Sequence, residues 1–220
     1  NIKRVKAICE LLIKKGINKK IKWWANARVN LDLDTMKLMK AAGCRLIIPG
    51  FESGVQSILN NMNKGITIEQ SIQYVKNAKK AKLLVHGCFM VGNPGETQQT
   101  MVETLEFAKK LKLDTAQFYP LIPYPGTKAY AWALENGYLK TKNYSQWLTD
   151  DGLHNTVISF PNLTDKNLVE FCNYARRSFY LRASYIFRKG IQSIFSLEEA
   201  RRNIKSFRTF SRHLFSGNNH

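Results

Sequence analysis

Apolar strand patterns and amphipathic helix patterns alternate four times along this chain, and this alternation constrains the fold more than any other feature. The apolar runs predict strands at residues 21–29, 44–49, 83–91 and 115–121. Helical patterns follow them at residues 34–39, 55–62, 67–82, 97–111 and 127–136. Such a succession is typical of parallel βα units. Right-handed crossovers place the carboxyl ends of all these strands at one edge, where α/β folds bind ligands.

Turns of unusual composition follow three consecutive predicted strands. They are Pro49-Gly-Phe-Glu-Ser-Gly54, Gly92-Asn-Pro-Gly-Glu-Thr97 and Tyr119-Pro-Leu-Ile-Pro-Tyr-Pro-Gly-Thr127. In the first turn the glycines let the backbone approach a ligand, and Glu52 and Ser53 lie just past the strand. The Glu52 carboxylate can accept from a pair of ribose hydroxyls or hold an ammonium group. The alternative is a plain turn with a helix-capping acid. Three such turns at one edge predict one shared site.

In the second turn the backbone is a better ligand candidate than the side chains. The N–H and C=O groups of Val91 and Gly92 can bond to a flat base edge. Glu96 is interpreted as support for the turn, and Thr97 as the N-cap of the next helix.

The third turn is stiffened by proline, which fixes the course of the chain and can shape one wall of a pocket. Two cationic residues are weaker candidates for the same edge. Lys64 can reach a carboxylate but is one of many lysines, and Arg28 ends the first strand, where a charge is either functional or simply leaving the sheet.

Composition narrows the class of protein. No run reaches the roughly 18–20 apolar residues that cross a membrane, and no signal peptide pattern opens the chain. The four cysteines lie at least 35 residues apart, so their spacing predicts no metal site within this chain. We interpret them as buried small hydrophobic residues in a reducing cytoplasm.

The formal net charge of +18 is concentrated in two regions. Residues 1–22 hold eight Lys/Arg against one Glu, and residues 164–215 hold eleven against four acids. This charge suits nucleic acid, an anionic membrane surface or an acidic substrate, and it equally suits solvated helix faces or a missing acidic partner segment.

The alternation stops after Gly137. Residues 138–163 are irregular, Thr164 is predicted to cap a long amphipathic helix that reaches Ile186, and a last helix is predicted over 197–215. We therefore predict two domains, a βα domain over 1–140 and a basic helical extension over 141–220. The chain opens with Asn inside a helical pattern, which we interpret as a fragment whose upstream part is absent.

Taken together, these motifs resemble the radical S-adenosylmethionine superfamily, in the class with an upstream cobalamin-binding domain. The chain is similar to anaerobic magnesium-protoporphyrin ester cyclases and hopanoid-type methylases of that class. The matching residues are Trp24 to Arg28, Ala42-Gly-Cys-Arg45, Gly50-Phe-Glu-Ser-Gly54, Lys64-Gly65, Val91-Gly-Asn-Pro-Gly-Glu-Thr97, Pro123-Tyr-Pro-Gly-Thr127, Trp147 with Asp151-Gly152, and Arg177-Ser-Phe-Tyr-Leu-Arg182.

The resemblance implies the last four βα units of a partial (β/α)6 TIM-like barrel, followed by the helical extension. It implies S-adenosyl-L-methionine and a [4Fe–4S] cluster as cofactors, with the cluster cysteines and a cobalamin-binding domain upstream of this chain. From their positions in the family's motifs, the resemblance implies that Glu52 and Ser53 contact the ribose or methionine part of the cofactor. Arg28 and Lys64 are weaker candidates for contact with its carboxylate. The residues matching the adenine site are Val91, Gly92, Asn93, Leu121 and Pro123.

The implied reaction is radical methyl transfer or cyclisation on a small-molecule, tetrapyrrole or lipid substrate, and the fragment alone is predicted to be inactive. One alternative is a tRNA-modifying methylthiotransferase, against which the C-terminal region shows no β-barrel pattern. Another is a basic nucleic-acid-binding module, which predicts aromatics interleaved with Arg on an exposed face. A third keeps the enzyme in the cytoplasm with its cationic helices on an anionic membrane surface.

Overall fold

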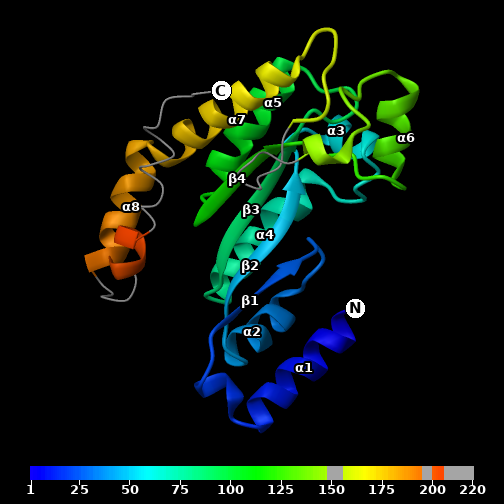
Figure 1. The fold of residues 1–220 in the computed structure, drawn as a ribbon. Coiled ribbons are helices and arrows are strands. Elements are labelled where there is room, and N and C mark those ends of the chain that lie inside the picture. Colours follow the sequence, from blue (N-terminus) through cyan, green and yellow to red (C-terminus); the bar gives the residue numbers. More distant parts are fainter. Residues whose placement is uncertain (148–155, 195–199, 206–220) are drawn as a thin grey trace. The chain divides into compact units, whose positions relative to one another are not determined.

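The computed structural model describes residues 1–147, 156–194 and 200–205 of the chain. These residues include a sheet of four parallel strands, in the order β1-β2-β3-β4 (Figure 1). The strands are β1 (Trp23–Ala27), β2 (Cys44–Glu52), β3 (Leu84–Val91) and β4 (Thr115–Pro120). The predicted α/β class and the four βα units are confirmed. The strand β2 runs beyond the predicted end at Pro49, so Glu52 is its last residue.

Helices connect these strands, and side-chain caps fix where most of them begin. They are α1 (Ile2–Lys14), α2 (Leu33–Ala41), α3 (Gln56–Asn61), α4 (Ile68–Lys80), α5 (Gln98–Lys110) and α6 (Lys128–Glu135). Thr67, Thr97 and Thr127 cap α4, α5 and α6, at the predicted positions. Helix α2 is capped by Asp32 instead of Asp34, because the Asp32 carboxylate accepts from the Thr35 N–H at 2.7 Å.

The aromatic core marks which face of the sheet the helices cover. Phe51, Phe89 and Phe118 lie side by side on β2, β3 and β4, with centroids 5.8 and 5.3 Å apart. The ring of Tyr74 from α4 meets Phe51 edge-on at 6.2 Å. Because successive strand residues point to opposite faces, Cys88 lies on the other face of β3 from Phe89.

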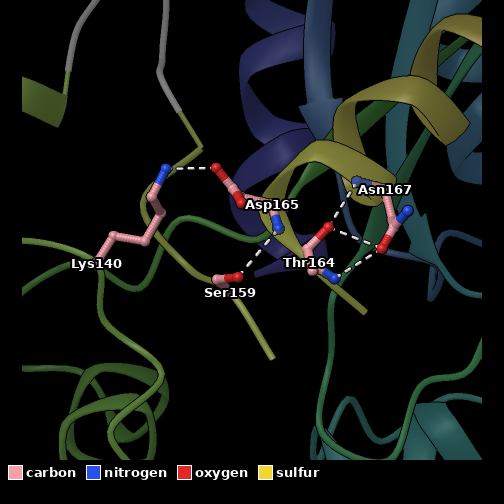
Figure 2. A network of polar contacts seen from close by, with 5 residues as sticks. All are labelled: Lys140, Ser159, Thr164, Asp165 and Asn167. Atoms are coloured by element: carbon pink, nitrogen blue, oxygen red, sulfur yellow. Dashed lines mark hydrogen bonds and ion pairs between the residues drawn. The ribbon is translucent and has the colours of Figure 1, made fainter. Parts of the chain in front are cut away.

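Polar contacts fix the beginning of α7 (Asp165–Tyr180), as Figure 2 shows. The Thr164 hydroxyl and N–H donate to Asn167 Oδ1 at 2.7 and 3.0 Å, and the Asn167 N–H donates back to the hydroxyl at 3.2 Å. Asp165 pairs with Lys140, and its N–H donates to Ser159 Oγ at 3.3 Å. Thr164 is therefore the cap that its sequence predicts, and the contacts with Lys140 and Ser159 join the irregular segment to the helix.

The long helix predicted to reach Ile186 is two helices. The first, α7, ends at Tyr180, and α8 spans Ala183–Ile194. The Arg182 side chain lies at the break and donates to the Phe179 carbonyl at 2.8 Å. Of the helix predicted over 197–215, residues 200–205 are helical, and the remaining positions lie outside the described residues.

The chain forms two compact units, Asn1–Cys172 and Asn173–His220. The domain boundary predicted near residue 140 stays a prediction. In the part of the chain that the structure describes, every helix is too short or too polar to cross a membrane.

Candidate functional site

The last residue of β2, Glu52, has a strained backbone. Glu52 has φ +64°, in the left-handed region that side chains other than glycine rarely adopt, and the strand register shifts between Gly50 and Glu52. The bulge folds the Glu52 side chain back over Gly50, where an added Cβ would lie 2.2 Å from Glu52 Oε1. Glycine is therefore required at position 50 for the carboxylate to lie there. Strain of this kind persists where the surroundings hold it, and it is concentrated at functional sites.

Three other side chains gather around Glu52 from different parts of the chain. The Lys64 ammonium, in the loop between α3 and α4, lies 2.6 Å from Glu52 Oε1. The Tyr119 hydroxyl of β4 donates to Glu52 Oε2 at 3.3 Å. Burial, followed by the Glu52 charge, raises the pKa of the Cys88 thiol to about 11, so the thiol is protonated at neutral pH. We call Glu52, Lys64, Cys88 and Tyr119 the β2-end cluster.

Burial and the nearby carboxylate also raise the pKa of Tyr119. The phenol therefore remains a hydrogen-bond donor to Glu52 at physiological pH. A carboxylate with one cationic and one neutral donor partner can exchange a partner for a ligand group.

Ser53 faces away from this cluster. Its side chain is buried, its hydroxyl lies 3.1 Å from Thr104 Oγ1 on α5, and the Val55 N–H donates to it at 3.1 Å. The Gly54 N–H also donates to Thr104, at 3.0 Å. The structure thus uses Ser53 to tie the β2 turn to α5, and its predicted cofactor contact stays a prediction.

The turn after β3 is held by Glu96. Glu96 Oε2 accepts from the Asn93 N–H at 2.9 Å and from Asn93 Nδ2 at 3.0 Å, and Nδ2 also donates to the Met90 carbonyl at 2.8 Å. The interpretation of Glu96 as support for the turn is confirmed. Burial raises the pKa of the Glu96 carboxyl to about 7, although the Asn93 donors oppose the shift.

Two acceptors of this turn are buried without a hydrogen-bond partner among the described residues, Asn93 Oδ1 and Glu96 Oε1. A proton on Glu96 would remove one of these unpaired acceptors, in line with its raised pKa. A ligand with N–H donors would satisfy the other. Asn93 therefore suits the predicted contact with an adenine amino group.

The remaining adenine candidates surround the same turn. The Val91 carbonyl accepts from the Leu121 N–H at 2.7 Å, which joins the ends of β3 and β4. Gly92 has φ +84°, and an added Cβ would lie 3.0 Å from the side chains of Ile158 and Leu168. Pro123 is buried in the next turn. The backbone here is close-packed, and its contact with a cofactor stays a prediction.

Arg28 is exposed immediately after β1. Because Ala27 pairs with Pro49, Arg28 lies at the same carboxyl edge of the sheet as Gly50. The structure thus brings Glu52 and Lys64 into contact and leaves Arg28 at the edge beside them.

Sequence reasoning missed two members of the β2-end cluster. Tyr119 was named only as the first residue of the third turn, and Cys88 was predicted only as a buried hydrophobic residue, whereas Cys88 is half-buried. The period-two pattern of β3, with Val85, Phe89 and Val91 buried, carries a signal for Cys88 because it places residue 88 on the opposite face. The four cysteines are free thiols.

Comparisons with known proteins show what this chain is similar to. The sequence profile of the Radical SAM superfamily matches residues 1–108. An uncharacterized methyltransferase of Pyrococcus horikoshii is 40% identical over 74% of this chain and 35% of its own length. Residues 1–108 belong to the radical S-adenosylmethionine superfamily.

A second relative is the anaerobic magnesium-protoporphyrin IX monomethyl ester cyclase of Cereibacter sphaeroides. It is 29% identical over 59% of this chain and 22% of its own length. The chain therefore spans about a third or less of these two curated relatives.

A solved structure shows that the fold is also shared. The radical S-adenosylmethionine methyltransferase TsrM of Kitasatospora setae, solved with cobalamin and a [4Fe–4S] cluster bound, matches with a TM-score of 0.62 at 17% identity. The match covers 77% of this chain and 40% of TsrM. At this identity the match shows the fold alone.

The described residues offer partners for S-adenosylmethionine but no group of ligands for an iron–sulfur cluster. In the described segments, His, Cys, Asp and Glu side chains do not group as the ligands of a metal ion would, so no residue here is assigned to the iron–sulfur cluster. S-adenosylmethionine carries both an ammonium and a carboxylate group, and the Glu52–Lys64 pair offers one charge for each.

Proposed function

We propose that this chain is part of a radical S-adenosylmethionine enzyme that transfers a methyl group or closes a ring on a small-molecule or lipid substrate, tetrapyrroles included. The observation that carries the proposal is the β2-end cluster, with Glu52 held in a strained bulge and paired with Lys64. The names of the relatives, a methyltransferase and a cyclase, support the two reaction outcomes.

Bound S-adenosylmethionine, reduced by a [4Fe–4S] cluster, would supply the 5′-deoxyadenosyl radical. This chain's residues would bind and orient the cofactor. Glu52 would accept from its ammonium or ribose hydroxyls, and Lys64 would leave Glu52 to pair with its carboxylate, with Arg28 as a second cation at the edge. Tyr119 would keep the Glu52 carboxylate in place during the exchange.

The other predicted contacts have supporting roles in this proposal. Backbone and side-chain groups at the ends of β3 and β4 would line the adenine, namely Val91, Gly92, Asn93, Leu121 and Pro123. Ser53 would hold the β2 turn against α5.

Partners of this chain are part of the proposal. The cluster cysteines, the preceding barrel strands and a cobalamin-binding domain would come from segments upstream of this chain, which alone would be inactive. A stoichiometric [4Fe–4S] spectrum after reconstitution of this chain with iron and sulfide would overturn that part.

The proposed location is the cytoplasm, with an anionic membrane surface as a partner.

Equilibrium dialysis of the 220-residue chain against S-adenosylmethionine tests the assignment of the cluster. Glu52→Gln should lower the affinity at least about tenfold, because a charged hydrogen bond contributes about 1.5–3 kcal/mol. Glu135→Gln, at an exposed position of α6, is the matched control. Equal affinity of the Glu52→Gln variant and the wild type would remove Glu52 from the site.

The methylthiotransferase alternative has less support from the fold. Where the C-terminal region is described, it consists mainly of α7 and α8, and its isolated β-bridges form no small barrel.

A further inference from the structure

Helix α8 presents its apolar side outward, the reverse of the usual arrangement. At 100° per residue, one side of the helix carries Ala183, Ile186, Phe187, Gly190, Ile191 and Ile194, and each of these is exposed. We call this set the α8 apolar face. The opposite side carries Tyr185, Arg188, Lys189 and Gln192, each buried or half-buried. A surface helix of a globular protein normally buries the apolar side and exposes the polar one.

The exposed fractions show how complete the reversal is. Phe187 is 72% exposed and Ile194 is 80% exposed, whereas Tyr185 is 9% exposed. Helix α4 follows the normal rule, because it buries Tyr74, Val75 and Ala78 against the sheet. An apolar face this exposed is typical of a surface that binds a membrane or another partner.

Contacts within the C-terminal unit hold the polar side of α8 inward. The Tyr185 ring lies 5.6 Å from the Phe179 ring, and the Arg182 guanidinium lies 4.0 Å from the centroid of Phe179. The Arg188 guanidinium lies 5.5 Å from the Tyr185 centroid. These contacts fix the rotation of α8 about its axis, so the apolar face points away from its own unit's aromatic cluster.

A second contact fixes the same rotation from the next helical segment. Asn203 Nδ2 donates to Ser193 Oγ at 2.9 Å, and Ser193 lies between Lys189 and Ile186 around the helix. Residues 200–205 therefore meet α8 at one edge of the apolar face and leave Phe187 and Ile194 exposed.

The stretch of chain that contains α8 carries charge of one sign. Residues 173–194 contain five Lys/Arg and no Asp or Glu. A helix with an apolar face, a cationic opposite side and low overall hydropathy is the pattern that lies in the interface of an anionic bilayer. With 12 residues, α8 is about 18 Å long, which suits lying in the interface and not crossing it.

We propose that α8 is an interfacial anchor that lays Phe187, Ile191 and Ile194 into the surface of an anionic membrane. Lys189 and the arginines of 173–194 would attract the headgroups, and their long side chains can reach back to the membrane surface. The anchor deepens the membrane part of the proposed function, on which it rests, and does not depend on the radical chemistry.

Nucleic acid fits this surface less well. Base stacking needs exposed aromatic rings beside cations. Phe179 and Tyr185, the rings beside Arg182, are buried and already engaged. The exposed side is mostly aliphatic, and aliphatic side chains suit acyl chains better than bases.

Co-sedimentation with lipid vesicles tests the anchor, using the 220-residue chain. We expect binding to vesicles of phosphatidylglycerol and phosphatidylcholine, weaker binding to phosphatidylcholine alone, and weakening as salt is raised. The double variant Phe187→Ser/Ile194→Ser should lose at least about tenfold in binding to the anionic vesicles, because two large side chains no longer leave water. The control Ile72→Ser/Val102→Ser, at exposed apolar positions of α4 and α5, should bind like the wild type.

Several outcomes would overturn the anchor. They are unchanged vesicle binding by the α8 double variant, equal binding to neutral and anionic vesicles, and a wild-type dimer in sedimentation equilibrium that the double variant abolishes. The last result would assign the face to a second copy of the chain. Loss of generic RNA binding in the same variant would assign it to nucleic acid. S-adenosylmethionine affinity of the same samples reports separately on the β2-end cluster, so the two proposals fail independently.

Discussion

Two carboxylates lie at the carboxyl ends of neighbouring strands of the sheet, and the protein holds them in opposite ways. Glu52, the last residue of β2, adopts a left-handed backbone conformation and pairs with Lys64 and Tyr119, which come from other parts of the chain. Glu96 after β3 is tied to Asn93 of its own turn, and burial raises its pKa to about 7. Position at a strand end therefore does not assign a function. A carboxylate paired with a cation can exchange partners, whereas one that holds its own turn cannot leave without breaking the turn.

The largest expected difference between the two residues is in stability. Glu96→Ala removes the acceptor of the Asn93 N–H and one of the two acceptors of Asn93 Nδ2. A buried donor that is left unpaired costs about 1–3 kcal/mol. We expect the free energy of unfolding, measured by urea denaturation, to fall by about 3 kcal/mol. Glu135→Ala should change it little. An unchanged urea midpoint for Glu96→Ala would contradict the structural role of this carboxylate.

The pH dependence of stability sharpens the comparison. The carboxyl pKa of Glu96 is about 7 in the folded protein against an ordinary value of 4.5, so between these values the unfolded chain releases the proton first. Stability should therefore fall as pH rises from 4.5 to 7 and level off above, by an amount on the order of 2–3 kcal/mol. Urea midpoints across this range should show the loss in the wild type and in Glu52→Gln. The same slope in Glu96→Gln would assign it to another group.

Local features of the sequence predict much of this fold. The apolar runs predict the four strands, and Thr67, Thr97 and Thr127 predict the starts of the helices that they cap. Both signals are readable because periodicity and capping act over a few residues. Contacts that depend on strand register were not predictable in the same way. The approach of Tyr119 to Glu52 requires the register across β2, β3 and β4 and the bulge after Gly50.

The break between α7 and α8 was missed for a different reason. The amphipathic pattern continues from Leu168 to Ile186, so periodicity alone predicts one helix. The contact at the break is local, since Arg182 turns back to the carbonyl and ring of Phe179, three residues before it, and periodicity carries no signal for such a contact. The sequence likewise gives no signal that Ser53 is buried against Thr104, because residues 51 positions apart meet only after folding.

Two glycines of the β2 turn test the comparison at a smaller scale. An added Cβ at Gly54 would lie 2.5 Å from Phe107 Cβ and 2.9 Å from Thr104 Cα, so α5 itself must shift. At Gly50 it would meet the flexible end of Glu52. We expect Gly54→Ala to lower the free energy of unfolding by about 2 kcal/mol and Gly50→Ala by less than about 1 kcal/mol. Gly50→Ala should nevertheless weaken S-adenosylmethionine binding in dialysis, because the carboxylate is displaced. Equal stability losses would mean that Glu52 is held as rigidly as α5.

The smallest expected effect on stability belongs to Glu52 itself. Glu52→Gly relieves the left-handed backbone at φ +64° by about 1 kcal/mol, which offsets part of the cost of the lost contacts with Lys64 and Tyr119 and of the added freedom of the unfolded chain. The net change in urea denaturation should stay within about 1 kcal/mol, while S-adenosylmethionine affinity falls at least about tenfold. A variant that lost more than about 2 kcal/mol while binding the cofactor normally would make Glu52 a structural residue of the same kind as Glu96. If a ligand site lies at the end of β2, we expect Glu52 to have a strained backbone, to contribute little net stability and to be required for binding.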